Sequence, residues 1–292
     1  MRRQWAELPR DARDAIERQI GLVRSVATPD LGVSSEFTAI LTTDCERVFC
    51  KGIRADGQRA WMHRNEAAVS PHVPAEWSPP LLWELVVAGW LLLGFEYVPG
   101  SHPDLSPNSA DLGPVAETVA ALADVLTPCP AAARYQLGDR WGGALGWAAL
   151  YGNAPDDLDP WARRQIATLA TWERTAWLSG DTLAHVDLNP GNMLVTDGRV
   201  RVVDWAWSAR GPAWVDAAYL VVRLVHKGHA PESAEAWARQ VPAFAKAPEP
   251  VLTAFAAKLA GMWEFTARSP KARPHARALA DAARVWVAHR LQ

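Results

Sequence analysis

The chain has 292 residues, 49% of them hydrophobic and 21% charged, and a formal net charge of −2. These values are typical of a folded globular protein and exclude a disordered or fibrous chain. The slightly negative net charge and the lack of a long run of Lys and Arg argue against a dedicated nucleic-acid-binding protein, which needs a basic surface for phosphates.

The 3 cysteines show no C-x-x-C spacing, which predicts neither a disulfide framework nor a zinc site and indicates a cytoplasmic protein. The longest apolar run, residues 81–95, contains Glu84 and Gly89. It falls short of the roughly 20 apolar residues that cross a membrane, so no membrane partner is expected.

The first third of the chain alternates between helical and strand patterns. Apolar residues at steps of three or four predict an amphipathic helix within residues 3–26. Residues 37–53 form two β-rich runs around a polar turn and predict a hairpin. A helix over about 58–70 and a second strand pair within 81–98 follow. This order indicates an α+β fold.

Residues 98–114 are rich in Pro, Gly and Ser and predict a linker. Residues 184–204 predict a β-island in a region that is otherwise helical. The sequence therefore predicts a small strand-rich lobe over 1–98 and a larger, mainly helical lobe over 99–292. The helices expected beyond the linker span 115–127, 159–178, 214–227, 233–245, 249–267 and 273–290.

The β-island begins with HVDLNPGN, residues 185–192, and an Asp-Gly pair at 197–198 predicts a two-residue hairpin turn. Mirroring the chain about this turn places Asp204 opposite Gly191 and next to Asn192. Amide and carboxylate oxygens are hard ligands, so Asn192 and Asp204 predict a Mg²⁺ site that also holds a nucleotide.

Asp187 lies on the loop that enters this hairpin, five residues before Asn192. A carboxylate at this place can accept the proton of an attacking hydroxyl, which makes Asp187 the predicted catalytic base. We expect His185 to hold the loop through backbone hydrogen bonds rather than to titrate in the reaction.

These motifs resemble the aminoglycoside phosphotransferase family, the small-molecule branch of the protein-kinase-like fold. HVDLNPGN is similar to its catalytic loop, and residues 202–216, VVDWAWSARGPAWVD, are similar to its metal-binding strand and the segment that follows. The resemblance implies a bilobal α+β kinase-like fold that binds ATP or GTP with Mg²⁺. It implies phosphate transfer to a hydroxyl of a small molecule, with an aminoglycoside or related antibiotic as the leading candidate.

The resemblance also assigns residues that bind the nucleotide phosphates. Lys51 on an apolar strand would hold the α- and β-phosphates, and Glu66 on the next helix would hold Lys51. Taken alone, these two residues are more typical of an edge lysine and a surface glutamate, but their order along the chain matches the family and favours the ion pair. The loop that would cover the phosphates has one glycine, Gly32, so Ser34 and Ser35 are the candidate contacts.

Glu96, Tyr97 and Val98 are similar to the family's hinge, whose backbone meets the nucleotide base. The chain departs from the family at Val186, where the antibiotic kinases usually have glycine. Asp216 matches an acid that follows the metal strand, and we expect it to have a structural role.

The acceptor is the least determined part of the site. We predict an acceptor pocket in the C-terminal lobe, with aromatic side chains as its walls and acidic side chains that could bind amino groups of the acceptor. As alternatives, the aromatic residues belong to the core and the acidic residues to a solvated loop. The candidate residues are Trp205, Trp207, Asp157 and Glu264.

Two other functional classes stay open. A catalytically silent, kinase-like nucleotide-binding sensor would bind nucleotide without phosphate transfer, and a helical interaction protein would bind no nucleotide. The oligomeric state is open as well, because helix 273–290 can pack on its own lobe or against a second chain.

Overall fold

The computed structural model describes residues 3–29, 35–142, 146–173 and 176–292. The chain divides into two compact units. The first comprises Met1–His102, Pro130–Ala133 and Gly191–Ser208, and the second comprises Pro103–Cys129, Arg134–Pro190 and Ala209–Gln292. The segment Gly191–Ser208 thus belongs to the first unit, whereas the predicted lobes, which followed chain order, assigned it to the second.

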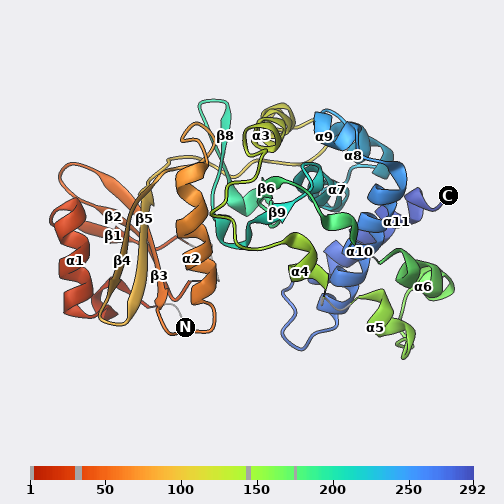
Figure 1. Cartoon of the computed structure of the whole chain (residues 1–292), viewed down its shortest axis with the longest axis horizontal. Helices are drawn as coiled ribbons and strands as arrows, with labels where there is room; N and C mark the ends of the chain where they lie inside the picture. Colours follow the sequence, from red (N-terminus) through yellow and green to blue (C-terminus); the bar gives the residue numbers. More distant parts are fainter. Residues whose placement is uncertain (1–2, 30–34, 143–145, 174–175) are drawn as a thin grey trace. The chain divides into compact units, whose positions relative to one another are not determined.

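A 5-stranded antiparallel sheet in the order β1-β2-β3-β5-β4 forms the centre of the first unit (Figure 1). It confirms both predicted strand pairs. Strand β1 was not predicted, because its residues were assigned to the N-terminal helix. The strands are β1 (Ser25–Ala27), β2 (Phe37–Thr42), β3 (Arg47–Arg54), β4 (Leu81–Val87) and β5 (Trp90–Glu96).

The N-terminal helix is shorter than predicted. A 3-10 turn, η1 (Trp5–Glu7), precedes α1 (Arg10–Ile20), and an extended segment follows. Pro9 stands at the N-cap of α1, and Gly21 ends the helix with a φ of 84°. A proline cannot donate within a helix and a left-handed residue cannot continue one, so these two residues confine α1.

Helices α1 and α2 (Ala60–Val69) cover opposite faces of the sheet (Figure 1). The face under α1 includes Cys50 of β3, and the face under α2 includes Ile53. Successive side chains of a strand point to opposite faces, so Lys51 shares the α2 face with Ile53. A 3-10 turn, η2 (Ser70–His72), continues α2.

The predicted Asp-Gly hairpin is confirmed. Strand β7 (Met193–Thr196) pairs with β8 (Arg199–Val202), with Met193 opposite Val202. Asp197 and Gly198 have φ values of 50° and 74°, as a tight primed turn requires. The 3-10 turns η4 (Pro190–Asn192) and η5 (Trp205–Trp207) flank the hairpin.

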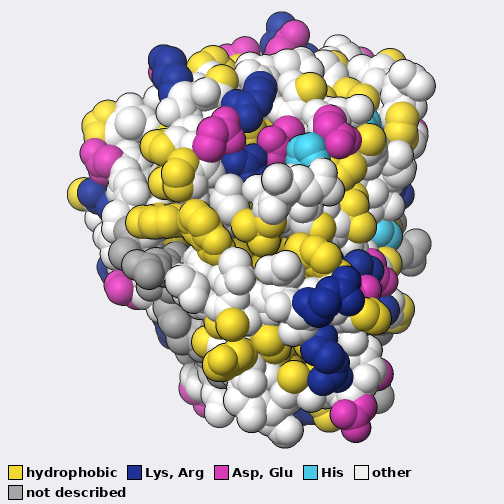
Figure 2. All heavy atoms as spheres, turned by 90° about the vertical axis from the view of Figure 1, so that its right-hand side faces the viewer, with side chains coloured by type: hydrophobic (Ala, Val, Ile, Leu, Met, Phe, Trp, Pro, Cys, Tyr) yellow, Lys and Arg dark blue, Asp and Glu magenta, His cyan; other side chains and the backbone are white. Residues whose placement is uncertain are grey.

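The second unit is mainly helical, which confirms the predicted α+β class. Helix α11 packs on α10 and α7 of its own unit, and Figure 2 shows this end of the chain with side chains of opposite charge side by side. The helices are α3 (Leu112–Val125), α4 (Leu137–Gly142), α5 (Trp147–Tyr151), α6 (Pro160–Trp172), α7 (Val215–His226), α8 (Pro231–Ala238), α9 (Pro242–Ala245), α10 (Glu249–Ala267) and α11 (Ala276–Arg290).

The boundaries of two predicted helices were wrong. The helix predicted over 159–178 ends at Trp172, and the one over 233–245 splits into α8 and α9 because Pro242 interrupts it. Helices α4 and α5 were missed because each is less than two turns long. The structure adds η3 (Ala176–Leu178) and a two-stranded sheet of β6 (Thr182–Ala184) and β9 (Ala209–Gly211).

Within the described ranges, none of the helices combines the length and the apolar character that crossing a lipid bilayer requires.

Candidate active site

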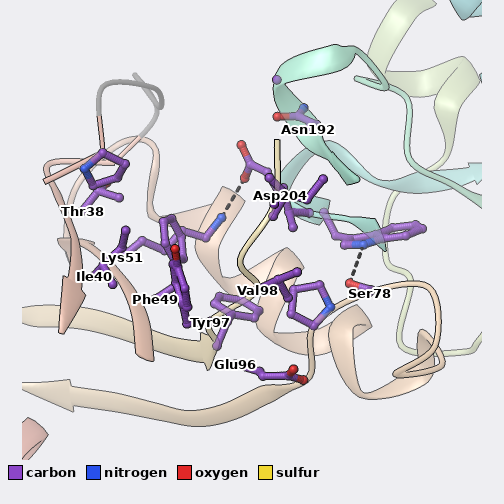
Figure 3. A pocket seen from close by; sticks show the side chains of 18 of the residues that line it. Thr38, Ile40, Phe49, Lys51, Ser78, Glu96, Tyr97, Val98, Asn192 and Asp204 are labelled. Atoms are coloured by element: carbon purple, nitrogen blue, oxygen red, sulfur yellow. Dashed lines mark hydrogen bonds and ion pairs between the residues drawn. The ribbon is translucent and has the colours of Figure 1, made fainter. Parts of the chain in front are cut away.

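The first unit contains a cavity of about 290 Å³ (Figure 3). Its walls come from β2, β3, β5 and the β7–β8 hairpin, and they are mostly apolar. The charged and amide groups that line it are few, and they include Lys51, Glu66, Asn192 and Asp204. An apolar cavity with a few convergent polar groups is typical of a small-ligand site.

Lys51 lies at the centre of the polar groups. Its Nζ is 2.5 Å from Oε2 of Glu66 and 2.7 Å from Oδ1 of Asp204. Burial alone would lower the pKa of Lys51, but the two carboxylates outweigh burial and raise it to about 12. Burial raises the pKa of Glu66 to about 7 against the opposing charge of Lys51. The structure thus brings together the two residues of the predicted ion pair.

Asn192 and Asp204 meet at the open end of the β7–β8 hairpin. The Val203 backbone N–H donates to the Asn192 carbonyl at 2.9 Å, which extends the hairpin register by one pair beyond Met193 and Val202. Asp204 has a φ of 67°, a left-handed conformation that ends β8 and begins η5.

The donor set of this hairpin end fits Mg²⁺. One amide and one carboxylate, Asn192 and Asp204, offer oxygen ligands to the cavity. Among the described residues no group of three or more His, Cys, Asp or Glu could hold a metal by itself. A cation held by so few protein ligands takes its remaining ligands from water and phosphate, which is the usual arrangement for Mg²⁺ with a nucleotide.

The predicted hinge residues Glu96, Tyr97 and Val98 line the same cavity. The Glu96 carboxylate pairs with Arg201 of β8 at 3.1 Å, and the Arg47 guanidinium lies 3.9 Å from the centre of the Tyr97 ring. The side chains of Glu96 and Tyr97 are therefore engaged, which leaves their backbone as the means of contact with a base.

The base of the phosphate-covering loop is tied to α2. Oγ of Ser35 and Nε2 of His63 form a hydrogen bond of 3.1 Å, and Ser34 lies outside the described residues. Burial and the charge of Lys51 lower the pKa of His63 to about 3, so the imidazole is neutral. His63 was not predicted from the sequence. It could have been found from its position three residues before Glu66, which places both side chains on one face of α2.

The predicted catalytic loop lies in the second unit and is held by Asp216 of α7. The backbone N–H groups of His185 and Val186 donate to the Asp216 carboxylate at 2.7 and 2.8 Å. Burial of this carboxylate raises the pKa of Asp216, and the nearby His185 and the two N–H groups oppose that rise. The Asp187 N–H donates to Nδ1 of His185 at 3.3 Å. Both His185 and Asp216 thus fix the loop that presents Asp187.

Asp187 itself is half-buried, and the Asn189 side chain donates to its backbone carbonyl at 2.8 Å. The charge of Asp187 raises the pKa of Tyr219 on α7, which burial raises more strongly. It also raises the pKa of His275, against the larger lowering by burial. The carboxylate of Asp187 is therefore close to this part of the second unit.

The four predicted acceptor residues do not gather within one unit. Trp205 is buried, lines the cavity of the first unit and donates from Nε1 to Oγ of Ser78 at 3.1 Å. Trp207 is 38% exposed and packs edge-on against Trp61. Trp207 is therefore more accessible than Trp205.

The acids of that prediction, Asp157 and Glu264, lie in the second unit and are already paired. Arg268 reaches Asp157 at 2.6 Å and Glu264 at 2.7 Å, and Arg277 reaches Glu264 at 2.5 Å. Their negative charge is thus balanced by arginines of the same unit.

Several solved structures have the same fold. An aminoglycoside phosphotransferase from Alicyclobacillus acidocaldarius subsp. acidocaldarius matches with a TM-score of 0.66 and 15% identity over 99% of this chain and 97% of that chain. A thermostable mutant of an aminoglycoside phosphotransferase, in ternary complex with ADP and hygromycin B, matches with a TM-score of 0.64 and 16% identity over 94% and 97%.

A macrolide 2′-phosphotransferase from Brachybacterium faecium matches with a TM-score of 0.55 and 18% identity over 93% of this chain and 97% of that chain. These likenesses confirm the predicted bilobal kinase-like fold.

A search among curated proteins finds no match to the sequence. The sequence profile of the phosphotransferase enzyme family matches residues 39–257, which is more than half of the chain and includes every motif on which the resemblance was based. The predicted family is therefore confirmed, and the chain belongs to the phosphotransferase enzyme family.

Proposed function

We propose that this protein transfers the γ-phosphoryl group of ATP, bound with Mg²⁺, to a hydroxyl group of a small molecule. The observation that carries the proposal is the buried cluster of Lys51, Glu66 and Asp204 on a cavity that Asn192 also lines. A structural neighbour bound to ADP and hygromycin B, and others described as antibiotic phosphotransferases, support it.

The first unit supplies the nucleotide-binding residues in this proposal. Lys51 holds the α- and β-phosphates, Glu66 positions Lys51, and the hairpin residues Asn192 and Asp204 hold Mg²⁺, which neutralises phosphate charge when bound. The backbone of Glu96 to Val98 meets the base, which does not by itself distinguish ATP from GTP. Ser35 and, by sequence alone, Ser34 contact the phosphates. The nucleotide-binding lobe is residues 1–98 in this proposal, and the catalytic lobe is residues 99–292.

Asp187 accepts the proton of the attacking hydroxyl. The loop that carries it is fixed by Asp216 and His185, so the carboxylate is held in place before a substrate binds. Phosphoryl transfer passes through a loose transition state, and its catalysis depends on positioning and on neutralised charge more than on covalent chemistry.

By family resemblance an aminoglycoside or related antibiotic is the leading candidate for the acceptor, with Trp207 as a candidate wall of its site. We place the reaction in the cytoplasm, because Cys45, Cys50 and Cys129 form no disulfide within the described ranges, as is usual in a reducing compartment.

The test is phosphate transfer from ATP and from GTP, with and without Mg²⁺, to a panel of hydroxylated antibiotics and amino-alcohols. Asp187→Asn is compared with the wild type. Product that forms with the wild type and is lost in the variant supports both the reaction and the role of Asp187. Nucleotide binding without transfer to any acceptor indicates the sensor function instead, and no nucleotide binding refutes the proposal.

A further inference from the structure

One face of α7 carries Asp216, which holds the predicted catalytic loop, at one end and the cationic Arg223 further along. Asp216, Tyr219, Arg223 and His226 follow one another at steps of three or four, so they share one side of the helix. Asp216 stands at the end that holds the catalytic loop. At a rise of about 1.5 Å per residue, Arg223 lies about 10 Å further along the helix axis, a distance comparable to the length of a small substrate.

The Arg223 guanidinium lies near two aromatic rings of the second unit. It lies 5.3 Å from the Tyr219 ring centre and 5.1 Å from that of Trp263 on α10, and it donates to the Tyr219 hydroxyl at 3.3 Å. Aromatic faces fix the plane of a guanidinium without neutralising its charge. The half-buried side chain is thus pre-positioned.

Across the described ranges, no Asp or Glu side chain forms an ion pair with Arg223, whereas Arg268 and Arg277 both pair with Glu264. A half-buried guanidinium with several N–H donors and no anion is suited to binding the anion of a ligand.

Arg273 adds a second positive charge on this side of the second unit. Trp263 packs edge-on against His275, with ring centres 6.4 Å apart. Burial lowers the pKa of His275, and Arg223, Arg273 and His226 lower it further, while Asp187 alone among its charged neighbours raises it. Arg223, Arg273 and Asp187 are therefore all close enough to His275 to act on its imidazole.

We infer that the acceptor carries an oxyanion, a carboxylate or a phosphate, which Arg223 binds while the acceptor hydroxyl faces Asp187. The inference rests on the proposed function and narrows its substrate class to hydroxylated acids and sugar phosphates. A polycationic amino-sugar would place its ammonium groups beside Arg223 and Arg273, and the acids that could attract it, Asp157 and Glu264, are paired.

The test compares matched acceptors with the wild type and two variants. The acceptors are glucose, gluconate, glucose 6-phosphate and kanamycin, and kcat and KM are measured for each together with the KM of ATP. Arg223→Gln removes the cation, and Arg164→Gln removes an exposed arginine of α6 as the matched control.

We expect the anionic acceptors to have lower KM values than glucose and kanamycin. Arg223→Gln should raise the KM of the anionic acceptors about 10-fold or more, as the loss of a charge-assisted hydrogen bond does, and leave the KM of ATP unchanged. Arg164→Gln should change neither. A preference for glucose 6-phosphate over gluconate identifies a phosphate as the anion, and the reverse identifies a carboxylate.

Three results would overturn the inference: a preference for kanamycin or glucose, an equal effect of Arg223→Gln on all four acceptors, or no transfer to either anionic acceptor. Mg²⁺-dependent ATP binding is measured in parallel on the same samples. Its absence refutes the proposed function as well, whereas its presence with transfer only to a cationic acceptor refutes the inference alone.

Discussion

The backbone N–H of Val186 donates to the Asp216 carboxylate at 2.8 Å while Val186 adopts a φ of 68°. A β-branched residue is strained in this left-handed region, where glycine is not. The loop therefore keeps a backbone shape suited to glycine although the chain has valine there. The hydrogen bonds from Val186 and His185 to Asp216 compensate for this strain.

Replacing Val186 should reveal that strain. Glycine is normally less stabilising than alanine, but here we expect Val186→Gly to be more stable than Val186→Ala by about 1 kcal/mol, because alanine keeps the left-handed penalty. Urea denaturation of the two variants measures the difference. Both lose the buried valine methyl groups, so the comparison isolates the backbone. A more stable alanine variant would show that the loop relaxes to an ordinary conformation.

Asp216→Asn should lower kcat without weakening ATP binding. The asparagine side chain has only one oxygen to accept the N–H groups of His185 and Val186, and its NH₂ group would face one of these N–H donors. The loop is then no longer fixed, and Asp187 loses its position. A misplaced base costs about 100-fold in rate. Steady-state kinetics give kcat, and calorimetric titration with ATP gives Kd. A loss of ATP affinity equal to the loss of rate would instead indicate a general folding defect.

The bond between Ser35 and His63 should affect the nucleotide. We expect Ser35→Ala and His63→Phe each to raise the KM of ATP by about 3- to 10-fold, the usual range for one hydrogen bond, and to leave the acceptor KM unchanged. Because both changes remove the same bond, the double variant should resemble either single variant. Additive effects would mean that the two residues act independently.

Glu264 should stabilise the second unit in a pH-dependent way. Burial would raise its pKa, but Arg277 and Arg268 outweigh burial and hold the pKa below its ordinary value. A carboxylate with a depressed folded-state pKa contributes stability above its unfolded-state pKa of about 4.3, and this contribution is lost as the pH falls through the folded-state value.

Glu264→Gln should therefore lower the free energy of unfolding by about 1–3 kcal/mol at pH 7, since two arginines lose their common partner. The difference from wild type should shrink as the pH is lowered below about 4. Thermal unfolding across this pH range measures it, with Glu117→Gln on exposed α3 as the control. A difference that persists unchanged at low pH would show that packing, not charge, stabilises this site.

The parts of the site that the sequence predicted depend on local signals. The Asp-Gly turn sets the register that joins Asn192 to Asp204, and a lysine within an apolar strand requires a buried partner such as Glu66. What was missed depends on contacts between distant segments. Ser35 meets His63 only once the sheet and α2 have formed, and Asp157 is paired with Arg268, 111 residues away.

The wrong element boundaries have a different, local cause. The N-terminal helix was extended past Pro9 and Gly21 because apolar periodicity continues on both sides of each residue. Periodicity records which side chains face the core, and backbone chemistry decides where a helix ends.

The division of the chain also determines how the protein can be dissected. The first unit is built from Met1–His102, Pro130–Ala133 and Gly191–Ser208, and the segments between these belong to the second unit. A fragment that stops at residue 102 would retain Lys51 and Glu66 but lack Asn192 and Asp204, so it would carry a lysine with one of its two acids. A minimal nucleotide-binding protein would instead need residues 191–208 joined to residue 102 by a linker. The hairpin would then belong to the first unit in the sequence as it does in the fold.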